Sequence, residues 1–372
     1  MSSSICIFTH HYHPQLSGIG NFVDGLAHAL TARGDRVVIV TNDSMRVGVG
    51  HSVENGLEVI RLPCIPLLDG RLPLPKKTSD YYRLLQTLDD YEWNGVLINT
   101  RLFPLSLEGL KFAADHSAKA VVLDHGSAYL SFNQPFLDYF VRRYEDWITD
   151  RVKSFEPDFY GISSKSVEWL QHFNITAKGV ISNSINASFY RSISSGRDFR
   201  SELGIPQSSL VVAFVGRLIP EKGIYSIIEA ARTKDITKRD PLANEVKEAC
   251  SSNLFWLGRC NTEDISSLLQ QADVLCLPTR SEGFSTVLLE ASACGTPAVV
   301  TDVGGARELI LDDSYGTIIR SMASDEVVSA LCRLFDDRKL LSLQSRNSRA
   351  LVENRYNWDA TAMDVEKAFC IC

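Results

Sequence analysis

The sequence predicts an α/β protein with parallel sheets, divided into two Rossmann-like domains that face each other across a cleft. Two observations lead to this prediction. Short apolar runs alternate with helical patterns along most of the chain, and the alternation occurs in two separate series. The 372 residues are enough for two or three domains, and 45% hydrophobic with 22% charged residues is ordinary for a globular protein.

The first series covers the N-terminal half of the chain. Its apolar runs predict strands at residues 5–8, 37–41, 57–62, 95–99, 120–123 and 159–162. Helical patterns fall at residues 21–33, 133–155 and 163–172. The segment 133–155 is rich in aromatic residues, and a stripe of this kind more often belongs to a core than to a ligand site.

The second series predicts strands at residues 210–215, 254–257, 274–277, 298–301 and 317–319. Between the two series, residues 181–208 are rich in Asn, Ser, Gly and Arg, which indicates a connecting segment. The N-terminal domain is therefore expected at residues 1–185 and the C-terminal domain at residues 186–355.

Composition and charge exclude several classes of protein. The net charge is −7 and no basic stripe is present, which argues against a nucleic-acid partner. The first residues lack the basic start and long apolar region of a signal peptide, and no apolar run approaches the ~20 residues that span a bilayer. Cys6 and Cys276 lie in predicted buried strands, so reduced thiols and a cytoplasmic location are expected.

The segment from Ser281 to Glu290 is the most informative of the chain. It follows a predicted strand, and a helix is expected to begin near Ser285, so that the amides of its first turn form an anion site. Glu290 lies about one and a half turns into this apolar helix, where it can accept hydrogen bonds from hydroxyls on the bound anion. A phosphate beside a diol describes a nucleotide sugar. Taken singly, Glu282 and Glu290 are also compatible with solvated positions.

Two cations follow another predicted strand end. The strand ends at Gly216, and Arg217 and Lys222 come before the next helix. An arginine fork and a lysine point charge are suited to binding a diphosphate. The alternative is a surface ion pair with Glu221.

Three features of the N-terminal half complete the candidate site. Gly18 and Gly20 follow the first strand and allow a close approach of the backbone to a phosphate or sugar, although the pattern is not a full dinucleotide fingerprint. His125 stands at the end of a strand, where imidazole can hydrogen-bond a sugar hydroxyl. Three histidines at positions 10, 11 and 13 have spacing like that of metal ligands, but a fourth ligand is not evident, and no metal is expected.

Together these motifs resemble the retaining GT-B glycosyltransferases of family 4, over nearly the whole chain. The resemblance rests on Arg217 with Lys222, on the pair Glu282 and Glu290, on the glycines of residues 304–308, and on a closing Tyr-Asn-Trp at residues 356–358. It implies that the final helix, residues 356–372, crosses back to the first domain. It also implies transfer of a sugar from a UDP- or GDP-linked donor with retention of configuration. The acceptor would be a saccharide, a lipid-linked molecule or a small molecule.

The resemblance also implies a role for each candidate residue. Arg217 and Lys222 hold the donor diphosphate, while Glu282 and His125 contact the transferred sugar. Glu290 takes the ribose hydroxyls. The remaining nucleotide-binding positions are Gly18, Gly20, Gly216, Phe284, Ser285, Thr286 and Val287. No Asp-x-Asp pair occurs in the sequence, so these protein cations are expected to do the electrostatic work of a metal, and no cofactor is expected.

The sequence departs from the family pattern between Ala231 and Ser252, where no strand-like run is found. The C-terminal domain is therefore expected to lack one strand and its loop. This keeps two alternatives open, a weakly active or inactive sugar-nucleotide-binding protein and a GT-B sugar-nucleotide epimerase. A dehydrogenase and a phosphorylase lack their motifs. Contact with the inner face of a membrane is also kept open, since many members of the family act on membrane-borne acceptors.

Overall fold

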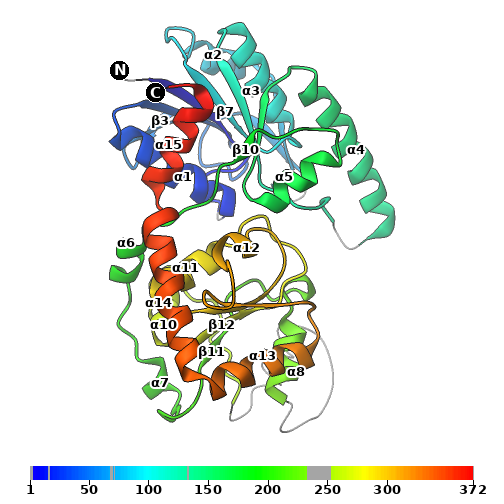
Figure 1. Cartoon of the computed structure of the whole chain (residues 1–372). Helices are drawn as coiled ribbons and strands as arrows, with labels where there is room; N and C mark the ends of the chain where they lie inside the picture. Colours follow the sequence, from blue (N-terminus) through cyan, green and yellow to red (C-terminus); the bar gives the residue numbers. More distant parts are fainter. Residues whose placement is uncertain are drawn as a thin grey trace. The chain divides into compact units, whose positions relative to one another are not determined.

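The computed structural model describes residues 3–15, 17–67, 70, 72–131, 134–232 and 253–371 (Figure 1). Its contacts divide the chain into two compact units. Unit 1 consists of Met1–Asn183 with Trp358–Cys372, and unit 2 consists of Ser184–Asn357. The sequence placed the corresponding boundaries at residues 185/186 and 355/356.

Unit 1 is built on an eight-stranded sheet with the strand order β10-β9-β8-β7-β1-β2-β4-β3. Neighbouring strands are parallel except β3, which is antiparallel to β4. Each strand predicted in the first series is present in this sheet. The bounds are β1 Ser4–Phe8, β2 Arg36–Asn42, β3 Gly50–Glu54, β4 Leu57–Leu62, β7 Gly95–Asn99, β8 Lys119–Asp124, β9 Asp158–Gly161 and β10 Gly179–Val180, with a separate hairpin of β5 Cys64–Leu67 and β6 Leu72–Pro75.

Helices cover both faces of this sheet, as expected for parallel strands that are buried on both sides. The core on one face includes residues of α2, α3 and α5. On the other face α15 lies beside α1, with Trp358 against Gly25 and Phe369 against Gly95 (Figure 1). The bounds are α1 Gly18–Ala32, α2 Ser79–Gln86, α3 Pro104–Asp115, α4 Pro135–Lys153, α5 Ser164–Gln171 and α15 Trp358–Phe369.

Unit 2 contains a parallel sheet with the order β11-β12-β13-β14. Its strands are β11 Val212–Ala213, β12 Val274–Leu277, β13 Ala298–Thr301 and β14 Thr317–Ile319. The strand predicted at residues 254–257 is wrong, since only an isolated bridge at Leu254 forms there. This apolar run instead packs Leu254 and Trp256 against Ile224 and Ile228. The missing strand expected between Ala231 and Ser252 falls on residues 233–252, which lie outside the described residues.

Helices α8, α13 and α14 share a core with this sheet. Helices α6, α10 and α11 pack against one another. Unit 2 has the helices α6 Ala187–Ser192, α7 Phe199–Glu202, α8 Ile224–Arg232, α10 Thr262–Gln271, α11 Thr286–Cys294, α12 Ala306–Leu309, α13 Ser324–Asp336 and α14 Arg338–Arg355, with a 3₁₀ turn, η1, at Pro220–Lys222.

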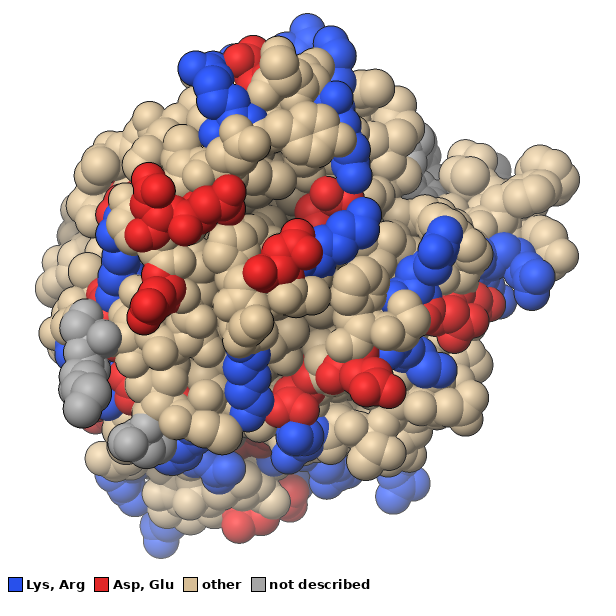
Figure 2. Space-filling model, turned by 90° about the horizontal axis from the view of Figure 1, so that it is seen from above, with Lys and Arg blue, Asp and Glu red and all other residues tan. Residues whose placement is uncertain are grey.

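Acidic and basic side chains are interspersed over the face drawn in Figure 2. Within the part of the chain that the structure describes, we find no helix that combines the length and the apolar character needed to cross a membrane.

The contact between α1 and α15 yields a stability prediction. A β-carbon added at Gly25 would lie 2.3 Å from the Trp358 ring, so Gly25→Ala forces the two helices apart. Overpacking of this kind costs about 1–3 kcal/mol, against a gain in helix propensity of about 1 kcal/mol or less. We expect a net loss in the free energy of unfolding, measured by urea denaturation. Gly179→Ala is the matched control, because its nearest neighbour is an ordinary 3.6 Å contact with Tyr160. Equal stability of the two variants would contradict the packing described here.

Candidate functional site

In unit 2, the loops that follow β11 and β12 are joined by backbone contacts. Gly223 ends η1 with φ of +75°, and a β-carbon there would lie 2.1 Å from the Pro278 carbonyl oxygen. The Arg280 amide donates to the Glu221 carbonyl over 2.7 Å, and the Thr279 hydroxyl donates to the same oxygen. The two strand ends therefore present their side chains from one connected surface.

Lys222 and Glu282 form an ion pair across these two loops. Their side chains are 18% and 16% exposed, so the pair is mostly withdrawn from solvent. The sequence left open an ion pair with Glu221, but the structure gives Lys222 this other carboxylate. Arg217 follows β11 on the exposed surface, as does Gly216, and has no ion-pair partner within the described ranges.

The loop that carries Glu282 rests on two glycines. A β-carbon at Gly304 would lie 2.6 Å from the carbonyl oxygens of Glu282 and Gly283, and one at Gly305 would lie 2.5 Å from the Phe284 ring. Gly304 has φ of +53°. The Phe284 side chain is buried and supports the loop from within the protein. Only the backbone of Phe284 is therefore left to contact a ligand.

Helix α11 begins where the sequence placed it, with Ser285 as N-cap and Thr286 as first helical residue. The Ser285 hydroxyl accepts a hydrogen bond from the Leu288 amide. The amides of Thr286 and Val287 belong to the first turn, which has no carbonyl partner inside the helix. This end of α11 is therefore suited to an anion.

Glu290 lies within α11 in a largely buried position, next to Tyr190 of α6. Burial raises the pKa of Glu290, and the Tyr190 hydroxyl opposes the rise. The pKa of Tyr190 is raised by burial and by the charge of Glu290. Sequence reasoning missed Tyr190, because it is a hundred residues away in the chain and no motif marks it. The burial of the Glu290 carboxylate shows that it is not a solvated surface group.

The glycines of unit 1 lie at the start of α1. The Ser17 hydroxyl caps this helix by accepting from the Gly20 amide over 2.9 Å. A β-carbon at Gly18 would meet nothing within 4 Å, whereas one at Gly20 would lie 3.0 Å from the Ser17 oxygen. Only Gly20 is therefore required by local packing, and Gly18 stands at an open position.

His125 follows β8, as the sequence predicted. Its Nε2 lies 2.9 Å from Asn99 Oδ1, at the end of β7, and its ring is edge-on to Phe22 at 5.1 Å. Burial lowers the pKa of His125 to about 3, so the ring is neutral near pH 7. A neutral imidazole that donates from Nε2 to Asn99 keeps Nδ1 as an acceptor. Asn99 was not among the predicted site residues, although its strand-end position was a usable signal.

The histidines of the first loop serve packing and hydrogen bonding. His10 stacks on Phe103 with 3.5 Å between ring centroids, and His11 Nε2 lies 2.8 Å from the Gly70 carbonyl oxygen. Burial, with the neighbouring His11 and His125, lowers the pKa of His10. Among the described residues, no group of three or more His, Cys, Asp or Glu side chains is arranged to hold a metal.

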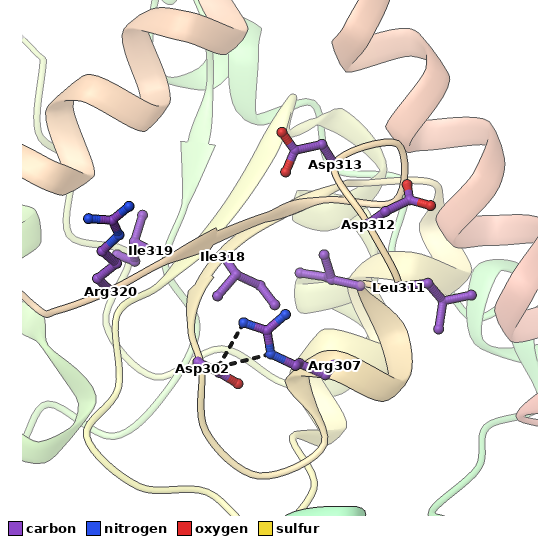
Figure 3. A pocket seen from close by; sticks show the side chains of 9 residues that line it. Asp302, Arg307, Leu311, Asp312, Asp313, Ile318, Ile319 and Arg320 are labelled. Atoms are coloured by element: carbon purple, nitrogen blue, oxygen red, sulfur yellow. Dashed lines mark hydrogen bonds and ion pairs between the residues drawn. The ribbon is translucent and has the colours of Figure 1, made fainter.

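A cavity of about 440 Å³ opens elsewhere in unit 2 (Figure 3). Arg307 is held on one side of it by Asp302, at 2.9 Å, and Asp312 and Asp313 lie on the other. None of the predicted site residues lines this cavity. The candidate site is thus defined by strand ends and a helix start, and not by the cavity.

Comparisons with known proteins identify the architecture. Residues 196–351 match the model of the family Glycosyl transferases group 1. An uncharacterized glycosyltransferase of Methanocaldococcus jannaschii is 20% identical over 98% of this chain and 97% of its own length. Sucrose-phosphate synthase from Thermosynechococcus elongatus has the same fold, with a TM-score of 0.75 and 19% identity over 99% of this chain and 98% of that one. The chain is a glycosyltransferase with the GT-B fold.

Other relatives of this glycosyltransferase are matched more locally. A GDP-mannose-dependent monoacylated alpha-(1-6)-phosphatidylinositol monomannoside mannosyltransferase of Corynebacterium glutamicum is 29% identical over 43% of this chain and 47% of its own length. The match thus spans less than half of that relative. The structure of Anabaena HepE in complex with UDP has a TM-score of 0.72 at 18% identity and covers 100% of both chains. At such identities the structural likeness establishes the fold.

The low pKa of His125 predicts how stability changes with pH. Its pKa is about 3 in the folded chain against an ordinary 6.5, so between these values the unfolded chain binds a proton that the folded chain does not. The contribution of neutral His125 to the free energy of unfolding is full above pH 6.5. It is lost as the pH falls towards 3, by at most about 1.4 kcal/mol per pH unit. His125→Gln should remove this part of the slope in the free energy of unfolding, whereas His51→Gln, on the surface strand β3, should not. If His125→Gln kept the wild-type slope, the neutral imidazole would be disproved.

Proposed function

We propose that this glycosyltransferase moves a sugar from a UDP- or GDP-linked donor to an acceptor with retention of anomeric configuration. The observation that carries the proposal is the arrangement in unit 2 of the Lys222–Glu282 ion pair, the start of α11, and Glu290 further along that helix. Similar proteins support a nucleotide-sugar donor, since one relative is GDP-mannose-dependent and HepE of Anabaena was solved in complex with UDP-glucose.

The donor diphosphate is placed against Arg217, Lys222 and the first amides of α11, which include those of Thr286 and Val287. Glu282 neutralises Lys222. When a diphosphate binds, it replaces the carboxylate as the partner of Lys222, so the lysine does not lose its counter-ion on binding. Glu282 can then accept hydrogen bonds from the hydroxyls of the transferred sugar. One ion pair thereby connects recognition of phosphate with recognition of sugar.

Ribose recognition is assigned to Glu290. A carboxylate with two acceptor oxygens can take both hydroxyls of a ribose diol, and charge-assisted hydrogen bonds of this kind are stronger than neutral ones. Tyr190 of α6 lies beside this carboxylate.

The reaction itself is proposed as a same-face substitution. The bond from the anomeric carbon to the diphosphate oxygen breaks, and a bond to the acceptor oxygen forms on the same face of the sugar. The proton of the acceptor hydroxyl passes to the departing phosphate. Arg217 and Lys222 stabilise the charge on the leaving group, and neutral His125 hydrogen-bonds the sugar near the reacting carbon. Gly18, Gly20 and Gly216 are backbone positions at which phosphate or sugar approaches closely.

The proposal includes no resident cofactor or metal, since the protein cations neutralise the diphosphate. The acceptor is a saccharide, a lipid-linked molecule or a small molecule, and the place of action is the cytoplasm. A sugar-nucleotide-binding protein of low activity and a sugar-nucleotide epimerase remain the competing functions, and the following measurement separates them.

Thermal stabilisation by UDP, GDP and ADP, together with donor turnover, tests the diphosphate site. We expect one of these nucleotides to raise the Tm of the wild type, and Arg217→Ala and Lys222→Ala each to reduce turnover by about a hundredfold or more. Arg333→Ala is the control, because Arg333 pairs with Asp313 on the surface of the same unit. Binding without turnover would favour the inactive binder, and an epimerised or released sugar without acceptor would favour the epimerase. No stabilisation by any nucleotide would reject all three functions.

The ribose contact is tested with Glu290→Gln. Loss of a hydrogen bond to a charged group corresponds to about 10- to 100-fold in affinity, and we expect that loss in the Kd of the preferred nucleoside diphosphate. The 2′,3′-dideoxy form of the nucleotide should bind the wild type as weakly as the normal nucleotide binds Glu290→Gln. The Glu290→Gln variant should bind the dideoxy form no more weakly than it binds the normal nucleotide. Glu353→Gln, which alters a surface carboxylate paired with Arg349, is the control. A Glu290→Gln variant that still distinguished the two nucleotides would disprove the ribose assignment.

A further inference from the structure

Helix α4 of unit 1 presents a row of exposed aromatic side chains. Phe136 is 79% exposed, Tyr139 61%, Phe140 53% and Trp147 52%. The aromatic content of this segment suggested a core stripe in the sequence, and for these four residues that interpretation is wrong. Isolated exposed aromatics are common on protein surfaces, but a group of four on one helix marks an interaction site.

The opposite face of α4 explains why the aromatic rings point outward. Ile148 and Val152 are fully buried in the core of unit 1. Glu145 lies next to them in a buried ion pair with Arg101, at 2.6 Å between Nη2 and Oε1. The buried side chains of Ile148 and Val152, together with the buried ion pair of Glu145, fix the rotation of α4 about its own axis. The aromatic side chains are therefore held in solvent by the fold itself.

Along one line of the outer face, the charged residues are all basic. At the helical spacing of three or four residues, Phe136, Phe140, Arg143, Trp147 and Arg151 form one line along α4. We call this line the aromatic–arginine face. The Arg151 guanidinium lies 5.4 Å from the centre of the Trp147 ring, and both arginines are exposed. The line contains no acidic residue.

The flanks of the line do not reverse this charge. Asp150, beside it, forms an ion pair with Lys153 at 3.6 Å, so its charge is locally compensated. Asp146 accepts a hydrogen bond from Tyr129 and is partly withdrawn from the surface. The face is thus locally cationic in a chain whose net charge is −7.

We propose that the aromatic–arginine face docks this chain on an anionic lipid bilayer surface. Tryptophan and tyrosine rings, apolar with a polar tip, are enriched at the boundary between headgroups and hydrocarbon, and arginine forks bind lipid phosphates. A helix with these two components lies in the plane of the interface. α4 forms an outer edge of unit 1 in Figure 1.

A second copy of the chain fits this face less well. A two-fold contact through the same line would bring Arg143 and Arg151 of one copy near those of the other, and like charges oppose association. An anionic surface satisfies the same arginines. Because the rest of the chain carries a negative net charge, attraction to such a surface depends on this face and weakens as salt increases.

Flotation of the full chain with lipid vesicles tests the proposal. At low salt, the wild type is expected to float with vesicles of phosphatidylcholine and phosphatidylglycerol, and to bind vesicles of phosphatidylcholine alone at least about tenfold more weakly. The triple variant Phe136→Ser, Phe140→Ser, Trp147→Ser removes the apolar part of the face, and Arg143→Gln with Arg151→Gln removes its charge. Each should reduce binding to the anionic vesicles about tenfold or more.

The matched controls are Phe335→Ser and Arg333→Gln on α13 of unit 2, because both side chains are about half exposed. These control variants should bind the vesicles as the wild type does.

Two further measurements distinguish the outcomes. Light scattering reports the molar mass, and a dimer that the triple variant dissociates would overturn the proposal in favour of a second copy. Failure of the wild type to float with anionic vesicles, or equal flotation of wild type and triple variant, would also overturn it. The Tm increase with nucleotide should be the same in the wild type and both face variants, which separates failure at this surface from failure of the donor site.

Discussion

The carbonyl oxygens of Glu282 and Gly283 rest against Gly304, and the Phe284 ring rests against Gly305, at distances that leave no room for a β-carbon at either glycine. This contact fixes the position of the loop between β12 and α11. It therefore also fixes the positions of the Glu282 carboxylate and of the first turn of α11. Lys222 is brought to the same loop by Gly223, which lies directly on the carbonyl of Pro278. Three glycines thus act together, because only a residue without a side chain lets these backbones approach so closely.

The candidate site residues at the strand ends differ in charge between the two units. In unit 2 the groups are ionic, with Arg217 exposed and Lys222 paired with Glu282. In unit 1 the corresponding position is held by neutral His125, whose proton affinity is suppressed by burial. This division suits the proposed reaction, in which the diphosphate needs cations and the transferred sugar needs hydrogen-bonding groups that do not compete for the phosphate.

The family match covers residues 196–351, which fall within unit 2. Unit 1 lies outside that match, with α4, its buried Arg101–Glu145 pair and its exposed aromatic–arginine face. In the function proposed here, unit 2 supplies donor recognition, and unit 1 supplies the surface that docks on the lipid bilayer.

The sequence by itself missed β3 and β10, and of the strand predicted at residues 210–215 only Val212–Ala213 forms. It predicted the remaining strands of the two larger sheets from their apolar runs, and it placed Arg217, Lys222, Glu282 and His125 after strands and Glu290 in a helix. Local pattern suffices there, because strand ends and helix starts are encoded by neighbouring residues. It failed at residues 254–257, where an apolar run packs on α8 without joining the sheet. Only the tertiary structure paired Lys222 with Glu282, brought Tyr190 to Glu290 and turned the aromatic residues of α4 towards solvent. These are contacts between segments far apart in the chain, or rotations of a helix set by its buried partners, and no local pattern contains either.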